Sequence, residues 1–226
     1  MRLFIRLIAA LFLLLPPQHS EAEQPLRVLV MGDSLMTTNG SKGTAVPQLL
    51  QTTLNADVKS QATTGARFAY ALPVTGALGF NIAKQWRQGS WDVVVMNGGG
   101  NDLWLGCGCG RCDRRLAKLI SPSGDAGLIP SAVARARSSG AHVIYVGYLR
   151  SPGFGSPIES CKVWGDRLEM RLAIMANRSS GVTFLSLADM VPTGDRSFHA
   201  ADRIHPSSKG SRAIAARIVS TIRAAR

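Results

Sequence analysis

Apolar and polar residues alternate along the chain in blocks that predict strands and helices in turn. Short, continuously apolar runs are typical of strands that are covered on both faces, and here they are bounded by glycine and polar turn residues. Five such runs occur: residues 28–31, a shorter one near Val58, and the stretches WDVVVMN, HVIYVGYL and VTFLSLADM. The chain therefore carries five candidate strands spread over most of its length.

Between these runs, apolar residues recur every three or four positions, which is the spacing of one face of an amphipathic helix. This spacing predicts helices over 46–54, within 126–138, over 164–175 and over 214–222. Thr44 is placed to cap the first helix, with Pro47 in its first turn, whereas residues 72–88 are interrupted by glycine and only moderately helical. Strands that alternate with helices predict an α/β fold, in which helices cover both faces of one parallel sheet.

The first 22 residues have the pattern of a secretory signal peptide. Two arginines precede an apolar run from Leu7 to Leu15, and small and polar residues then lead to Ala22. We expect cleavage after Ala22, which leaves residues 23–226 as a single domain in a periplasmic or secreted protein. An uncleaved membrane anchor is the alternative, but the apolar run is short against the ~20 residues that span a bilayer.

The chain is strongly basic, with a formal net charge of +12. The basic residues are scattered, as in Arg212, Arg217 and Arg223, and form no run of the kind that marks a dedicated nucleic-acid-binding arm. A positive surface keeps a protein soluble, and it also attracts anionic surfaces weakly. For an exported protein we expect no nucleic-acid partner, and a weak association with an anionic component of the cell envelope is the functional alternative to simple solubility.

Two of the apolar runs end in turns that carry reactive side chains. The first runs into Gly32, Asp33 and Ser34, and the run in WDVVVMN continues into the glycine-rich turn at 98–102. The carboxyl ends of parallel strands share one edge of a sheet, where α/β proteins bind their ligands, so we expect these turns to lie together. Taken alone, Ser34 fits the cap of the next helix better than a nucleophile, because Ser and Asp are ordinary residues of strand-to-helix turns.

Near the end of the chain, the stretch FHAADRIHPSSKG places Asp202 three residues before His205. One short loop could hold an imidazole and a carboxylate together, so that the carboxylate fixes the ring tautomer while the other ring nitrogen faces a serine. Separately, His205 suits a surface loop and Asp202 a cap; together with Ser34 they form a candidate catalytic triad. His199, six residues before His205, is expected to be dispensable.

Four short motifs resemble the four sequence blocks of the SGNH hydrolases, also called the GDSL family. They are GDS at 32–34, a lone Gly65 in QATTGARFA, GGND at 99–102 and DRIHP at 202–206, in the family's order and rough spacing. The resemblance covers essentially all of the chain after residue 22. It implies a flavodoxin-like three-layer α/β/α fold and an ester hydrolase with Ser34, His205 and Asp202 as its triad, and we expect neither cofactor nor metal.

The resemblance also implies an oxyanion hole, formed by the backbone N–H groups of Ser34 and Gly65 and by the side chain of Asn101. Loss of one such donor commonly costs ~3 kcal/mol of transition-state stabilisation. Met36 departs from the family pattern, since many members carry a small hydroxyl residue there.

Four cysteines stand in two groups, three in the stretch GCGCGRC at 107, 109 and 112, and Cys161 by itself. An even number in an exported protein favours disulfides, with a soft-metal site or a redox-active Cys109–Cys112 pair as alternatives. We expect Cys161 to bond to Cys107 or Cys109, with Cys109–Cys112 or Cys107–Cys112 as the companion bond. A Cys107–Cys109 bond is disfavoured, because a single intervening residue rarely permits relaxed disulfide geometry.

The substrate is the point at which the sequence leaves several hypotheses open. Trp104 and Leu105 follow the GGND turn, and Leu149 and Phe154 follow the HVIYVGYL run, so these residues could form an apolar wall for an acyl chain or simply anchor loops. The resemblance is compatible with short or medium acyl esters, lysophospholipids and acetylated polysaccharides. A cysteine-based redox or metal-binding envelope protein is the alternative of a different class, and it would depend on the cysteines rather than on Ser34.

Overall fold

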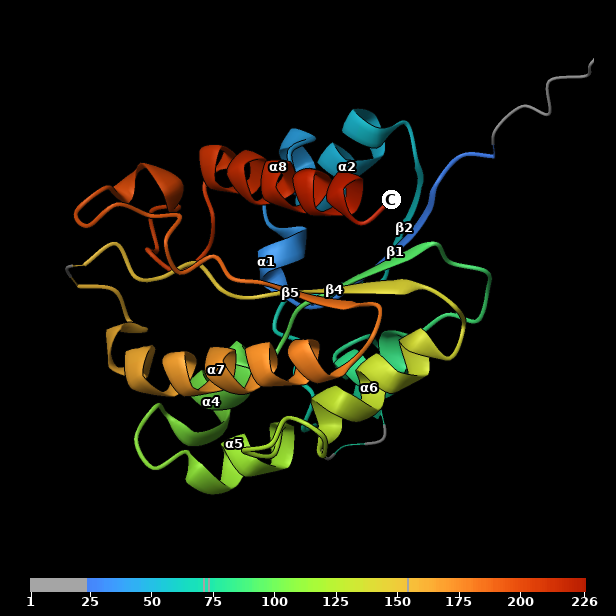
Figure 1. Ribbon diagram of the computed structural model, residues 1–226. Helices are drawn as coiled ribbons and strands as arrows, with labels where there is room; N and C mark the ends of the chain where they lie inside the picture. Colours follow the sequence, from blue (N-terminus) through green and yellow to red (C-terminus); the bar gives the residue numbers. More distant parts are fainter. Residues whose placement is uncertain (1–23, 71, 73, 154) are drawn as a thin grey trace, which may run out of the picture.

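The computed structural model describes residues 24–70, 72, 74–153 and 155–226; the predicted signal peptide and Phe154 lie outside the described residues. Five strands form one parallel sheet in the order β2-β1-β3-β4-β5 (Figure 1). The strands are β1 (Arg27–Met31), β2 (Asp57–Ser60), β3 (Val93–Met96), β4 (His142–Val146) and β5 (Val182–Leu185). The prediction of five strands in a parallel sheet is confirmed.

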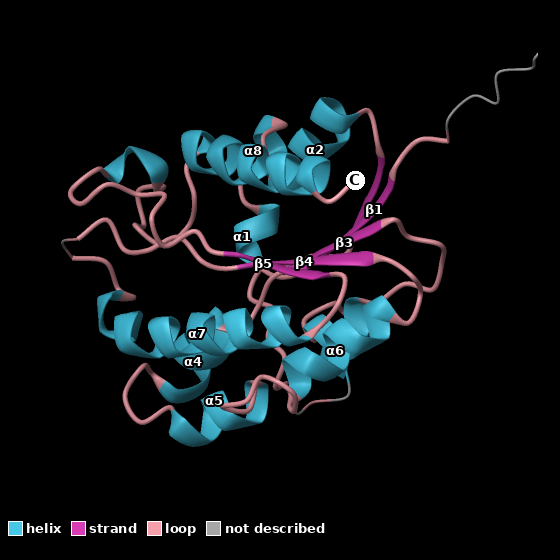
Figure 2. Ribbon diagram, viewed as in Figure 1, coloured by secondary structure: helices cyan, strands magenta, loops and turns pink. Residues whose placement is uncertain are grey.

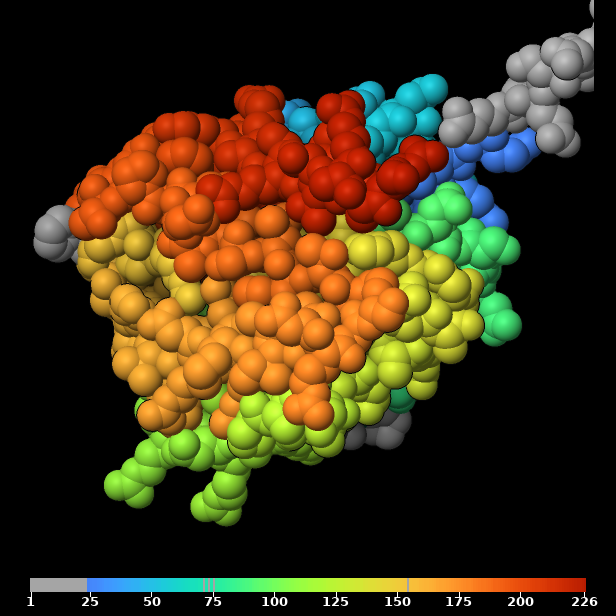
Figure 3. Space-filling view, viewed as in Figure 1, coloured from blue at the N-terminus to red at the C-terminus, as the bar shows by residue number. Residues whose placement is uncertain are grey.

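Helices cover both faces of the sheet and complete a three-layer α/β/α fold (Figure 2). One face carries α1 (Ser34–Thr37), α2 (Val46–Leu54) and α8 (Ser208–Ala224), and the other carries α4 (Gly100–Cys107), α5 (Asp113–Leu119), α6 (Leu128–Arg137) and α7 (Lys162–Arg178). The shorter helices are α3 (Val74–Ala77), η1 (Gly40–Lys42), η2 (Ile82–Gln85), η3 (Glu159–Cys161) and η4 (Arg196–Phe198). In the space-filling view, α8 in red and α7 in orange lie on either side of the β5 edge (Figure 3).

The strands pack apolar side chains on both faces of the sheet. Val28 and Val30 of β1 belong to a buried cluster with α2 and α8, whereas Leu29 and Met31 belong to the cluster formed with α4, α6 and α7. Successive residues of a strand point to opposite faces, so a strand covered on both sides needs an unbroken apolar run. Burial on both faces explains why these strands are recognisable from composition.

Different parts of the chain meet at the carboxyl-terminal and at the amino-terminal ends of the parallel strands. β1 pairs with β3 in a register that sets Val28 opposite Val93 and Met31 opposite Met96, so the turns after these strands leave the sheet side by side. At the opposite, amino-terminal edge, residues 24–27 and the C-terminal Arg226 line a common hollow. The two ends of the described chain therefore lie together, one strand length away from the turn that carries Ser34.

The start of α2 differs from the prediction. Thr44 does not cap this helix, because the helix begins at Val46 and Ala45 occupies the cap position. The Ala45 N–H donates to the side chain of Gln48 at 3.0 Å, and the Thr44 hydroxyl donates to Ser208 Oγ at 3.2 Å. Thr44 thus links the start of α2 to the start of α8 instead of capping α2.

The segment 72–88 holds two short helices, α3 and η2, rather than one moderately helical stretch. Gly79 lies between them at φ +77°, a conformation that residues with a side chain rarely adopt and that ends α3. In the part of the chain that the structure describes, no helix is both long enough and apolar enough to span a bilayer.

Candidate active site

The turn after β1 presents Ser34 at the carboxyl-terminal edge of the sheet. Gly32 adopts φ +152°, and a Cβ at this position would lie 1.8 Å from Asn97 Oδ1, so only glycine lets the backbone pass here. The Asp33 carboxylate accepts a hydrogen bond from the Leu35 N–H at 3.0 Å and caps α1. Ser34, the first residue of α1, retains 8% of its surface exposed.

The turn after β3 places Asn101 beside this serine turn. Asn101 lies in the first turn of α4, and its Nδ2 donates to the Ala66 carbonyl at 3.1 Å and to Asp33 Oδ2 at 3.4 Å. Gly65 precedes Ala66 in the loop after β2 and has φ +78°. The predicted motifs at 32–34, 65 and 99–102 therefore lie side by side, although Gly65 itself is not among the residues that line the cavity described below.

The loop before α8 holds the predicted histidine and carboxylate together. His205 Nδ1 and Asp202 Oδ2 are 2.6 Å apart, and Asp202 Oδ1 accepts from the backbone N–H groups of Ile204 and His205 at 3.0 Å each. Burial acts to raise the pKa of Asp202, but the hydrogen bonds from His205 and the two N–H groups outweigh it and hold the pKa below its ordinary value. Asp202 therefore stays ionised and orients the imidazole ring.

A cavity of about 440 Å³ brings these groups to one surface. Ser34, Asn101 and His205 all line it, and so do Trp104 and Leu149. Its size is typical of pockets for small organic ligands. No hydrogen bond between Ser34 and His205 occurs among the described residues; such bonds are often long in free enzymes and tighten in the substrate complex.

Two other sequence-selected residues lie away from this cavity. Leu105 does not line it and is 53% exposed, because the side chains of consecutive helical residues point in different directions and Trp104 takes the inward one. Of the two alternatives left open for Leu105, an apolar wall or a loop anchor, its position outside this cavity does not support the wall. His199 is buried outside the cavity, and burial lowers the pKa of its imidazole.

Comparison with known proteins identifies the family. The sequence model of the GDSL-like lipase/acylhydrolase family matches residues 30–213. The chain belongs to this family. It is an SGNH-type ester hydrolase with the three-layer α/β fold of that group, whereas no curated protein gives a significant sequence match.

Solved structures agree with this assignment. A protein from Slackia heliotrinireducens, assigned to the SGNH hydrolases, is 26% identical, with a TM-score of 0.62 over 88% of this chain and 100% of that one. The psychrotrophic esterase EstA from Pseudoalteromonas is 17% identical, with a TM-score of 0.55 over 87% of this chain and 96% of that one. An acetyl xylan esterase from Butyrivibrio proteoclasticus is 14% identical, with a TM-score of 0.58 over 88% of this chain and 64% of that one. The last two show likeness of fold.

A buried hydrogen-bond network around Asp33 supports the site of this hydrolase. Tyr148 donates its hydroxyl to Asp33 Oδ2 at 2.5 Å, and Asn97 donates to Asp33 Oδ1 at 3.0 Å. Burial raises the pKa of Asp33 above its ordinary value, although both hydrogen bonds act to lower it. Burial and the neighbouring Asp33 raise the pKa of Tyr148 well above its ordinary value, so this hydroxyl remains a donor.

The sequence analysis missed Tyr148, although one signal was available. Tyr148 follows β4 directly, and β4 is the neighbour of β3 in the sheet, so this position shares the edge at which Ser34 and Asn101 lie. Asp102 of the GGND motif was not assigned a role. It accepts hydrogen bonds from the Phe68 and Ala69 N–H groups at 2.9 and 2.8 Å, and so fixes the segment that follows Gly65.

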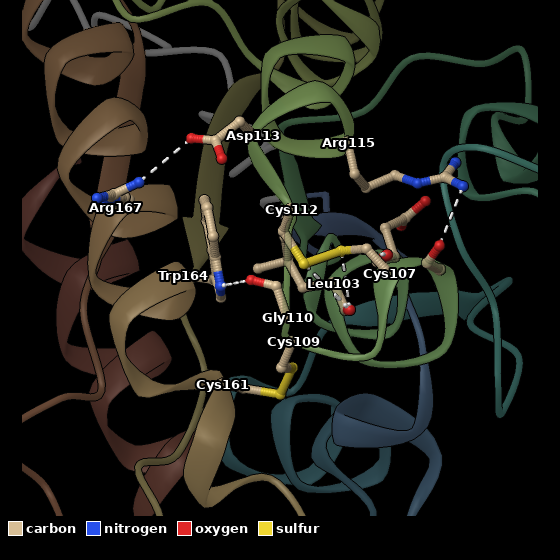
Figure 4. The surroundings of a disulfide bond; sticks show 12 residues. Leu103, Cys107, Cys109, Gly110, Cys112, Asp113, Arg115, Cys161, Trp164 and Arg167 are labelled. Atoms are coloured by element: carbon tan, nitrogen blue, oxygen red, sulfur yellow. Dashed lines mark hydrogen bonds and ion pairs between the residues drawn. A yellow bond between two sulfur atoms is a disulfide. The ribbon is translucent and has the colours of Figure 1, made fainter.

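The cysteines form two disulfides, Cys107–Cys112 and Cys109–Cys161, which is one of the two predicted arrangements. No cysteine of the described chain is free, and no group of ligating side chains there could hold a metal ion. The alternative of a Cys109–Cys112 redox pair is wrong, because each of these cysteines is bonded elsewhere. Cys109, the partner of Cys161, lies two residues after the end of α4 (Figure 4).

Proposed function

We propose that this SGNH-type hydrolase cleaves carboxylic esters with Ser34 as nucleophile, His205 as general base and Asp202 as the carboxylate that orients the base. The observation that carries the proposal is the common cavity: Ser34, Asn101 and His205 line it together, and His205 is hydrogen-bonded to Asp202 on the ring nitrogen Nδ1. None of the chemistry assigned to these residues requires a cofactor.

The chemistry follows from the hydrogen bond to Asp202. Because Nδ1–H donates to the carboxylate, Nε2 carries the lone pair and can take the proton of Ser34 Oγ as Oγ bonds to the ester carbonyl carbon. The tetrahedral intermediate then expels the alcohol, which receives that proton from His205. A water molecule, deprotonated by His205 in the same way, cleaves the acyl-enzyme and releases the carboxylic acid together with Ser34.

Three donors are available for the negative charge on the carbonyl oxygen. They are the Ser34 N–H at the start of α1, the Gly65 N–H and Asn101 Nδ2. Asn101 is held by the Ala66 carbonyl, and so its amide group is oriented before the substrate arrives. Preoriented donors of this kind stabilise a developing charge without reorganisation, and each is commonly worth ~3 kcal/mol.

The cavity lining favours esters of short to medium acyl chains, including lysophospholipid-type substrates. Leu103, Leu168 and Leu172 line its interior, and each is at least 98% buried. Charged side chains also line the cavity, namely Arg150, Lys162 and Asp166. Because such side chains can hydrogen-bond to sugar hydroxyls, they support a second candidate, the removal of acetyl groups from a polysaccharide. The likeness of fold to carbohydrate esterases favours the same candidate.

Export belongs to the proposal as well. The signal-peptide pattern over residues 1–22 and the two disulfides support a periplasmic or secreted enzyme, because disulfides persist in oxidising compartments. The basic surface supports weak attachment to an anionic component of the envelope rather than to nucleic acid.

The experiment is a substrate panel on residues 23–226, with p-nitrophenyl esters from acetate to decanoate beside an acetylated polysaccharide. We expect metal-independent hydrolysis, covalent labelling of Ser34 by a fluorophosphonate, and loss of both in Ser34→Ala. The polysaccharide candidate is favoured if acetyl release exceeds hydrolysis of every aryl ester. Activity that survives Ser34→Ala, or that depends on added metal, would contradict the proposal.

A further inference from the structure

The cavity lies between α4 and α7, and the ends of these two helices are joined covalently. α4 begins beside the proposed oxyanion donor Asn101 and ends at Cys107, two residues before Cys109. Cys161 directly precedes α7. The Cys109–Cys161 disulfide therefore ties the end of α4 to the start of α7 (Figure 4).

Both helices supply apolar walls of the cavity. Leu103 and Trp104 line it from α4, Leu168 and Leu172 line it from α7, and Cys161 itself is one of the lining residues. The distance between the two helices consequently sets the width of the space that an acyl chain can enter. The disulfide is thus both a part of the wall and the link that fixes its position.

The other links at this end of the helices are weaker. Trp164 Nε1 donates to the Gly110 carbonyl at 2.9 Å, and Arg167 forms an ion pair with Asp113 at 3.4 Å (Figure 4). Both partners of the ion pair are exposed, and exposed pairs contribute little to stability. Without the disulfide, the Trp164 hydrogen bond and the apolar packing of the two helices would be left to resist separation of the walls.

The second disulfide, Cys107–Cys112, does not join α4 to α7, and it therefore serves as a control for Cys109–Cys161. Cys107–Cys112 closes a loop within one segment, with a sequence separation of 5 against 52 for Cys109–Cys161. Neither of its cysteines lines the cavity, and Cys112 is fully buried. Its removal leaves α4 and α7 still joined.

We propose that the Cys109–Cys161 disulfide determines acyl-chain specificity, because it fixes the spacing of the α4 and α7 walls and so limits the space between them into which a longer acyl chain must pass. This inference rests on the proposed ester hydrolysis at Ser34. It assigns to the disulfide a role in choosing the substrate, and no role in the bond-breaking steps.

The test compares two double variants, Cys109→Ser/Cys161→Ser and Cys107→Ser/Cys112→Ser, with the wild type. The measured quantity is the ratio of kcat/KM for p-nitrophenyl octanoate to that for the acetate. In Cys109→Ser/Cys161→Ser we expect this ratio to rise about tenfold. A tenfold change is the lower end of the effect that one methylene group has on kcat/KM in an apolar pocket. In Cys107→Ser/Cys112→Ser, neither of whose cysteines lines the cavity, we expect the wild-type ratio and the wild-type rate of fluorophosphonate labelling at Ser34.

A second measurement covers the case in which Cys109→Ser/Cys161→Ser fails to fold. In folded Cys107→Ser/Cys112→Ser, a phosphine reductant acts on the Cys109–Cys161 bond alone, and alkylation of the two thiols verifies that it has opened. The octanoate-to-acetate ratio should rise on reduction and return on reoxidation. An unchanged or lower ratio after verified opening overturns the inference, whereas a wild-type protein that neither hydrolyses esters nor labels at Ser34 overturns the proposed function and the inference with it.

Discussion

At the scale of single residues, the carboxylate of Asp33 is the shared acceptor of the site. It receives hydrogen bonds from Tyr148, Asn97 and Asn101, and it also caps the helix that begins with Ser34. A buried carboxylate is costly unless such donors surround it. The same four bonds that stabilise this charge therefore fix the serine and the asparagine relative to each other.

Tyr148→Phe removes one of these donors and should lower the free energy of unfolding at pH 7 by about 1–3 kcal/mol, the usual cost of leaving a buried polar group short of a partner. Burial raises the pKa of Asp33 in the folded protein above its value in the unfolded chain. The stability that Asp33 contributes is therefore fully present below the unfolded pKa, and it is lost as the pH rises through the folded pKa. The substitution should raise this pKa further. The loss measured by urea unfolding should accordingly be larger at pH 7 than at pH 4.

Tyr145→Phe is the matched control for this prediction. Tyr145 is also fully buried, but its hydroxyl donates to the Gly98 carbonyl at 3.0 Å, an acceptor that does not titrate. Tyr145→Phe should lower the free energy of unfolding by similar amounts at pH 7 and at pH 4. Equal losses at pH 7 and pH 4 for Tyr148→Phe would show that Asp33 is not the group through which Tyr148 acts.

At the scale of elements, η2 holds the end of β1 in place. Gln85 of η2 is buried, accepts from the Gly32 N–H at 2.6 Å and donates to the Gly32 carbonyl at 2.9 Å. The two bonds act on the residue two positions before Ser34 and join segments 53 residues apart in sequence. A short 3₁₀ helix far from the nucleophile in sequence thus sets the path of the turn that presents it.

Gln85→Leu should leave the Gly32 N–H without a partner, whereas the Gly32 carbonyl keeps its hydrogen bond from the Thr63 N–H. The free energy of unfolding should fall by about 1–3 kcal/mol, the usual cost of one unpaired buried group. The rate of fluorophosphonate labelling at Ser34 should fall as well, because the turn loses its anchor. Gln88→Leu, on the exposed side of the same segment, is the control and should change neither quantity. Unaltered labelling in a destabilised Gln85→Leu would mean that the other hydrogen bonds of the turn, including those of Thr63 and Asn97, suffice to hold it.

Sequence patterns predicted the strands and the shared edge because both follow from local composition. An unbroken apolar run such as residues 93–96 can be buried on both faces only within a covered parallel sheet, and the edge then brings Ser34 and Asn101 together. Gln85 could not be found in this way, since nothing in its neighbourhood specifies a partner 53 residues away. The position of Tyr148 after β4 indicates the shared edge, but nothing near it specifies Asp33 as its partner. Thr44 was misassigned for the same reason: its hydroxyl is used by Ser208, 164 residues later.

At the scale of the whole molecule, the two disulfides should contribute unequally to stability. In the chain-entropy account, a cross-link stabilises by restricting the unfolded chain, and more so for longer loops. The Cys109–Cys161 bond, with a sequence separation of 52, should contribute up to about 4 kcal/mol and the Cys107–Cys112 bond, with a separation of 5, about 2 kcal/mol.

Thermal unfolding of the two double serine variants tests this order. Cys109→Ser/Cys161→Ser should have the lower Tm, and reduction of the wild type should lower the Tm at least as far. The reverse order would indicate that the local Cys107–Cys112 loop, rather than the long-range link, holds the helical layer that carries α4.

The edge of the sheet at which the two ends of the described chain meet has a consequence for how residues 24–226 can be attached to a support. Residues 24–27 and Arg226 share a hollow at the amino-terminal edge, while Ser34 and the mouth of the cavity lie at the other edge of the same strands. A linker, a fusion partner or a solid support joined at residue 24 or residue 226 would therefore attach the molecule at the amino-terminal edge of the sheet. The opening of the cavity, at the carboxyl-terminal edge, would stay accessible to substrate. The adjacency of the ends also means that a short peptide could join them into a circle without crossing the path by which a substrate enters.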